Sequence, residues 1–140
     1  MTQETDALEQ LLVTEHQAIW AYGVIGARLD DARRPRALAA YDAHRLLRDE
    51  LLTLLRARSL PTPGPALAYD LTVTDPRSAV QQAIRVEEAL CVRWRDLVAS
   101  TDDAALRRLA VRGLSEAAVR AVRWRQAAGS PTPTVPFPGA

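Results

Sequence analysis

Apolar side chains recur at spacings of three and four residues along four stretches of this chain, the period of an amphipathic helix. The pattern predicts helices over about residues 4–29, 35–58 and 76–100, and a fourth that ends near residue 128. Pro35 and Pro76 each suit the first turn of a helix. No alternating strand pattern competes with these stretches, so we expect an all-α protein.

The lengths of the connections predict how the helices are arranged. Short turns join the first helix to the second and the third to the fourth, which makes two antiparallel hairpins. The middle connection, residues 59–75, contains three prolines and a glycine. It can cover roughly 55 Å, whereas a 23-residue helix is only about 35 Å long. We therefore expect a crossover along the bundle, a single four-helix domain over residues 1–128, and an irregular Pro-rich tail over residues 129–140.

Four charged residues interrupt the apolar faces in a repeated pattern. Glu15 is followed 33 positions later by Arg48, Glu87 is followed 33 positions later by Arg120, and the two pairs are 72 residues apart. Counting from the turns places all four at one level of the bundle. A buried charge is costly unless it is paired or binds a metal. The sequence therefore predicts a polar cluster at mid-bundle, formed by two Glu–Arg ion pairs.

Composition excludes several classes of function. The formal net charge of the 140 residues is +1, which provides no strong field for nucleic acid or anionic lipid. The single cysteine, Cys91, allows neither an internal disulfide nor a Cys-based metal site. The first residues lack the features of a signal peptide, and no apolar run approaches membrane-spanning length. We expect a cytoplasmic protein with no nucleic-acid or membrane partner.

The chain also resembles a known superfamily. The runs from Glu15 to Gly26, from His44 to Asp49 and from Ala68 to Leu71 resemble an actinobacterial ferritin-like domain family of unknown function. The resemblance spans nearly the whole chain and implies a ferritin-like four-helix bundle. Di-iron members of that superfamily take a Glu from helices 1 and 3 and a Glu-x-x-His motif from helices 2 and 4.

By that resemblance, Glu15 and Glu87 match the single carboxylates. The Glu-x-x-His positions fall on Arg48-x-x-Leu51 and Arg120-x-x-Arg123, so both bridging carboxylates are arginine and both histidines are absent. Arginine is permanently charged and binds a carboxylate through two hydrogen bonds. The resemblance thus implies a degenerate metal site without metal or other cofactor. The leading hypothesis is a metal-free binding or structural module rather than an enzyme.

Two other functions stay open. Tyr41-x-x-His44 has the spacing of the metal motif, so Glu15, His44, Glu87 and Glu116 would be adequate for one metal in a metal-dependent oxidoreductase. His44 and Glu116 are expected about one turn from the level of the two glutamates, toward opposite ends of the bundle, which counts against this set. A carrier with a small-ligand pocket beside the ion pairs is the third possibility.

Two aromatic residues suggest self-association. Trp20 lies off the core stripe of the first helix, and exposed large aromatic side chains often mark interfaces. Phe137, in the tail, can dock on a neighbouring copy or on its own bundle. We therefore expect a homodimer, while the identity of any ligand or other protein partner is left open.

Overall fold

The computed structural model describes residues 2–140 and consists of four long helices. They are α1 (Gln3–Arg28), α2 (Arg34–Ala57), α3 (Pro76–Ser100) and α4 (Ala104–Ala127). No strand occurs among the described residues. The predicted all-α class is confirmed, and the helix boundaries lie within two residues of those expected from the apolar pattern.

Side-chain caps fix where three of the helices begin. Thr2 accepts a hydrogen bond from the backbone N–H of Thr5 at the start of α1. Asp75 and Ser78 form a reciprocal capping box at the start of α3, with Pro76 in the first turn. Asp103 accepts two backbone N–H groups at the start of α4. These caps satisfy N–H groups that have no partner inside the helix.

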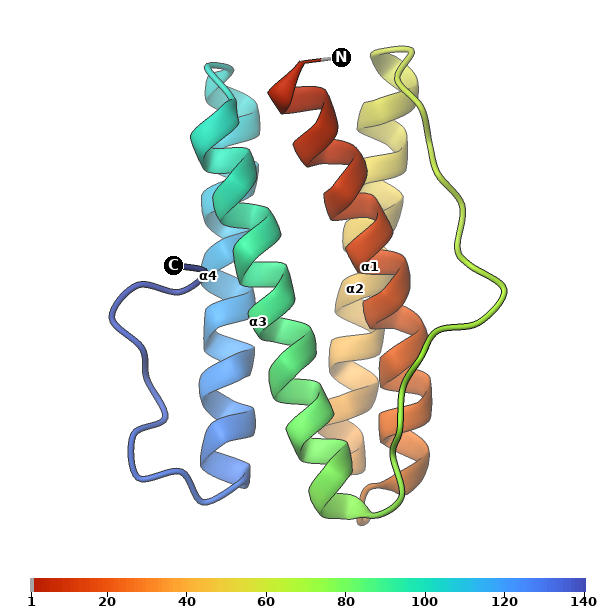
Figure 1. Ribbon diagram of the computed structural model, residues 1–140, viewed down its shortest axis with the longest axis vertical. Coiled ribbons are helices and arrows are strands. Elements are labelled where there is room, and N and C mark those ends of the chain that lie inside the picture. Colours follow the sequence, from red (N-terminus) through yellow and green to blue (C-terminus); the bar gives the residue numbers. More distant parts are fainter. Residues whose placement is uncertain (1) are drawn as a thin grey trace.

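The two hairpins are joined by one long crossover, as predicted. Figure 1 shows α1 and α2 running in opposite directions, α3 running parallel to α2, and α4 returning beside α3. The connection after α2 follows the full height of the bundle before α3 begins. In the interior α1 packs against both α2 and α3, and α3 packs against α4.

A polar layer divides the core into two apolar clusters. The first cluster contains Leu12, Leu47, Leu90 and Ala117, and the second lies on the other side along each helix. The second cluster contains Tyr22, Ala40, Ala83 and Trp124. Between them each helix places one polar residue, and these four are Glu15, His44, Glu87 and Arg120. The fold therefore gathers one polar side chain from every helix at mid-height.

In the first cluster α3 and α4 pack so closely that position 113 requires a glycine. A Cβ atom at Gly113 of α4 would lie 2.3 Å from the ring of Trp94 on α3, a distance that real Cβ atoms do not reach. The indole of Trp94 is fully buried. Gly113 thus lets α4 approach α3 closely enough for the polar residues of the two helices to meet.

The remaining segments follow the outside of the bundle. After α4 the tail turns back and runs over the α3–α4 side (Figure 1). The guanidinium groups of Arg125 and Arg95 donate hydrogen bonds to the carbonyls of Pro133 and Gly139 in this tail. No helix within residues 2–140 combines the length and apolar character needed to cross a membrane.

Candidate functional site

Glu15 of α1, His44 of α2, Glu87 of α3 and Arg120 of α4 form one buried cluster. Glu15, His44 and Glu87 have no exposed surface, and the side chain of Arg120 is 15% exposed. Each residue lies on the apolar face of its helix, so the packing that buries the neighbouring leucines also buries these charges. Such a layer is stable only if the charges neutralise one another.

The imidazole of His44 joins the two carboxylates. Its Nδ1 lies 2.7 Å from Oε2 of Glu15, and its Nε2 lies 2.9 Å from Oε1 of Glu87. Nε of Arg120 donates to the same Glu87 oxygen at 3.1 Å. The hydroxyl of Tyr22 also donates to it, at 2.6 Å, and accepts a hydrogen bond from the indole N–H of Trp124 at 2.9 Å. Glu87 is therefore the central acceptor of the cluster.

The cluster holds His44 in its charged form. Burial by itself lowers the pKa of His44, but the negative charges and hydrogen bonds of Glu15 and Glu87 outweigh it and raise the pKa to about 9. At neutral pH both ring nitrogens of His44 are then protonated, and each donates to a different carboxylate. An imidazolium in this state has no free lone pair for a metal.

The pKa values of Glu87 and Tyr22 are shifted in opposite directions. Burial raises the pKa of Glu87, but the hydrogen bond and charge of His44, helped by Arg120 and Tyr22, lower it below its ordinary value. Burial, followed by the charge of Glu87, raises the pKa of Tyr22 well above 10. At neutral pH Tyr22 stays a neutral donor. Two carboxylates then balance one imidazolium and one guanidinium, so the layer has no net charge.

The residues present do not fit a di-iron centre. Two carboxylates remain, but the other two helices supply a histidine and an arginine, and a guanidinium places positive charge where cations would bind. No group of three or more His, Cys, Asp or Glu side chains within residues 2–140 is arranged to hold a metal ion. Three buried atoms of the cluster, Oε1 of Glu15, Oε2 of Glu87 and Nη2 of Arg120, have no hydrogen-bond partner among the described residues.

The predicted pairing of Glu15 with Arg48 is wrong. The guanidinium of Arg48 contacts the carboxylate of its neighbour Asp49 at 2.8 Å, at the half-exposed edge of α2. The place beside Glu15 is taken by His44, one helical turn before Arg48, with its Nδ1 2.7 Å from Oε2 of Glu15. In the second hairpin the partner 33 residues away, Arg120, does contact Glu87. The shared spacing of 33 residues therefore identifies the contact in the second hairpin and misses it in the first.

The second candidate ligand set is brought together only in part. Glu15, His44 and Glu87 meet, so the expectation that His44 lies a turn away from the glutamates is wrong. Glu116 is exposed and takes no part in the cluster. Tyr41 is half-buried under the guanidinium of Arg45, and Arg123 is exposed. Neither belongs to the cluster.

Tyr22 and Trp124 extend the cluster, although the apolar spacing of the sequence marks them only as core residues. Both are buried, but their polar atoms extend the hydrogen-bond network to a second level of the bundle. A signal was present in the spacing. Tyr22 follows Glu15 by seven residues and Trp124 follows Arg120 by four, so each pair lies on one helix face. Buried Tyr and Trp usually find a partner for their polar atom.

Three comparisons with known proteins define the relatives of this chain. A family model described as "Domain of unknown function (DUF4439)" matches residues 7–140. The crystal structure of a conserved hypothetical protein, rv2844, from Mycobacterium tuberculosis is similar with a TM-score of 0.87 and 31% sequence identity. That similarity covers 89% of this chain and 96% of the mycobacterial chain. The comparison with curated proteins found no match.

Proposed function

We propose that this chain, which belongs to the family described as "Domain of unknown function (DUF4439)", is a metal-free ferritin-like domain that acts as a binding or structural module. In this proposal a buried ion-pair layer occupies the level at which a ferritin-like protein holds its di-iron centre. The crossover between parallel α2 and α3 supports the ferritin-like assignment, because bundles of that kind contain one long crossover.

The bridging imidazole of His44 carries the proposal. A histidine that binds a metal offers a neutral ring nitrogen and donates its other N–H to a second group. His44 instead uses both nitrogens on Glu15 and Glu87, within 2.9 Å. Arg120 adds a second fixed cation to Glu87. In this proposal His44 and Arg120 neutralise the charge of the two buried carboxylates, as metal ions do in a di-iron protein.

Metal analysis tests this proposal. We expect protein purified without chelator to contain far less than one iron, manganese or zinc per chain by elemental analysis. The reason is that Arg120 and protonated His44 repel cations from the two carboxylates. A matched measurement on Arg120→Glu, which supplies a third carboxylate at this level, gives the control. Stoichiometric metal in the wild-type protein would contradict the proposal.

A metal-dependent oxidoreductase is the second candidate. It is favoured by the buried Oε1 of Glu15 and Oε2 of Glu87, which have no hydrogen-bond partner within residues 2–140 and are of the ligand type that iron and manganese accept. Glu116, the fourth ligand that the sequence offered for such a site, is exposed and does not contribute. The metal analysis above also decides this alternative, since it requires a bound ion in the wild-type protein.

We also propose that the protein is a cytoplasmic homodimer. Trp20 remains 36% exposed, although the ring of Tyr69 from the crossover lies 5.6 Å from it. Light scattering at high micromolar concentration is expected to give the mass of two chains, and Trp20→Ser is expected to shift it toward one. Apolar burial at an interface is the driving force. A monomeric mass for the wild-type protein would contradict the dimer.

A further inference from the structure

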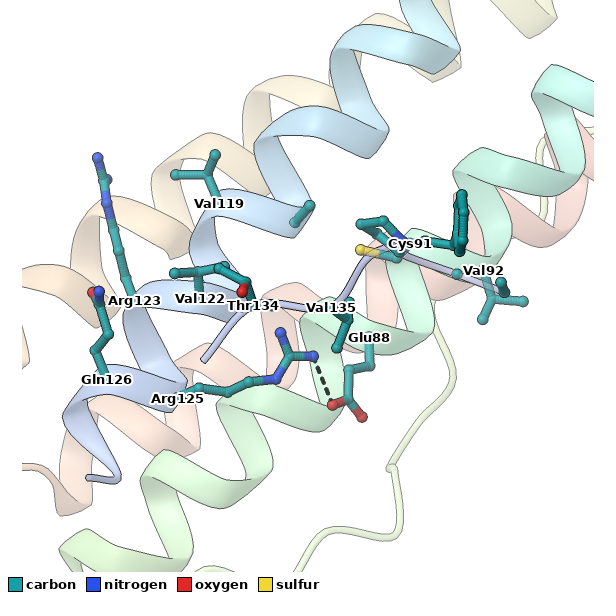
Figure 2. A pocket seen from close by; sticks show the side chains of 16 residues that line it. Glu88, Cys91, Val92, Val119, Val122, Arg123, Arg125, Gln126, Thr134 and Val135 are labelled. Atoms are coloured by element: carbon teal, nitrogen blue, oxygen red, sulfur yellow. Dashed lines mark hydrogen bonds and ion pairs between the residues drawn. The ribbon is translucent and has the colours of Figure 1, made fainter. Parts of the chain in front are cut away.

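A cavity of about 630 Å³ lies between the tail and the α3–α4 side of the bundle. Figure 2 shows Thr134 and Val135 of the tail in this space, which is also lined by Cys91 and Val92 of α3 and by residues of α4. The cavity is separate from the buried ion-pair layer, since none of Glu15, His44, Glu87 and Arg120 lines it. Its volume falls in the usual range for small-molecule sites, about 300–1,000 Å³.

The tail that covers the cavity is fixed near both ends. Arg125 of α4 donates to the carbonyl of Pro133 at 3.2 Å, and Arg95 of α3 donates to the carbonyl of Gly139 at 3.2 Å. Gly139 has a φ of +82°, and a Cβ atom there would lie 2.6 Å from the carbonyl oxygen of Cys91. Only glycine permits this contact. The tail is therefore held over the helices by specific interactions.

Between these two anchors the tail does not fill the space beneath it. The ring of Phe137 is 76% exposed, and Val135 is also exposed, although both line the cavity. The opposite wall is formed by apolar side chains on α3 and α4, which are Cys91, Val92, Val119 and Val122. Apolar walls that do not contact one another favour an apolar occupant.

The rim carries one positive charge without an acidic partner. Arg125 already pairs with Glu88 at 2.9 Å. Arg123 lines the cavity and is exposed, and its guanidinium forms no ion pair with any carboxylate in residues 2–140. Gln126 also lines the cavity and can donate through its amide. The site thus combines an apolar interior with one cationic and one amide donor at its edge.

We propose that this cavity binds a single-chain fatty acid, with the acyl chain between the tail and helices α3 and α4 and the carboxylate at Arg123. This inference rests on the binding role in the proposed function and gives it a ligand class. A carboxylate suits the guanidinium through charge-assisted hydrogen bonds. The acyl chain covers the apolar walls that the tail leaves apart.

Calorimetric titration with dodecanoate tests the site. We expect saturable binding of one dodecanoate per chain, and decanoate should bind about 15-fold more weakly because two fewer methylenes are buried. Arg123→Gln should weaken dodecanoate binding about fivefold, the size expected for an exposed charge pair, and should leave dodecanol binding unchanged. No binding of dodecanoate to the wild-type protein would overturn the proposal, as would equal affinities for dodecanoate and decanoate.

Substitutions at two valines of α4 test where the ligand binds. Val119 and Val111 are both 49% exposed, but only Val119 lines the cavity. Val119→Trp should therefore reduce dodecanoate affinity by at least about tenfold by filling the space, while Val111→Trp should leave it unchanged. Thermal unfolding of both variants checks that they remain folded. Equal effects of the two substitutions would overturn the assignment to this cavity.

Metal content measured on the same samples separates this inference from the proposed function. Stoichiometric metal would contradict the metal-free module without changing the fatty-acid result. A metal-free protein that does not bind dodecanoate would overturn the cavity assignment alone.

Discussion

Replacing His44 with leucine is expected to lower the free energy of unfolding by about 3–5 kcal/mol, the usual cost of removing one partner from a buried ion pair. Within residues 2–140, His44 donates the only hydrogen bond that the side chain of Glu15 accepts, and both side chains are fully buried. In the variant the carboxylate of Glu15 must either remain charged without a partner or take up a proton. Denaturation in urea at neutral pH measures the loss.

Two further variants control this experiment. Arg48→Leu changes the same helix one turn later, but the ion pair that Arg48 forms is with its exposed neighbour Asp49, so its cost should be at most about 1 kcal/mol. Glu15→Leu combined with His44→Leu removes the carboxylate as well and should be more stable than His44→Leu alone. A loss below about 1 kcal/mol for His44→Leu would show that the layer is not an ion-pair network.

The free energy of unfolding should fall by about 3 kcal/mol between pH 6.5 and pH 9. His44 has a pKa of about 9 in the folded protein, against an ordinary value of 6.5. The folded state therefore binds the proton more tightly than the unfolded state. This stabilisation is fully present below pH 6.5 and is lost as the pH rises through 9. Urea titrations at half-unit steps of pH measure it.

The second histidine provides the control for the pH experiment. His16 is buried on α1 beneath the crossover, where its Nε2 lies 3.1 Å from the carbonyl oxygen of Pro63, outside the ion-pair layer. His16→Asn should keep the pH dependence, and His44→Gln should remove it. The range ends at pH 9 because burial raises the pKa of Cys91 from its ordinary value of 9 to about 11, so above pH 9 its thiol adds a pH dependence of its own. A wild-type stability that is constant over this range would contradict a charged His44.

The fold could be predicted from the sequence because its determinants are local. The three- and four-residue apolar period sets the helices, and the length of residues 59–75 sets the crossover. The burial of Glu15 and Glu87 and the contact between Glu87 and Arg120 could also be predicted, since they depend on helix faces and on one short turn. Each of these inferences uses regular geometry.

The pairing in the first hairpin could not be predicted in the same way. Which residue of α2 lies beside Glu15 depends on the conformation of residues 29–33. A shift of α2 by one helical turn along α1 would place Arg48 there instead of His44. The Tyr22 and Trp124 contacts depend on side-chain conformations across three helices. The cavity depends on where the tail docks, and one of the two contacts that hold the tail joins residues 44 positions apart, Arg95 and Gly139. No local pattern encodes such a distance.

The distribution of charge over the buried layer has a consequence for how the chain assembles. Glu15 and His44 belong to the first hairpin, and Glu87 and Arg120 to the second, so each hairpin carries one buried anion and one buried cation. Either hairpin can form its own neutral pair before the other is present. The crossover then links the two hairpins covalently. It raises the effective concentration of one hairpin near the other to about the millimolar range typical of short flexible linkers. In this respect the two hairpins correspond to two different subunits joined by a covalent linker. The surface on which they pack together corresponds to the interface between those subunits.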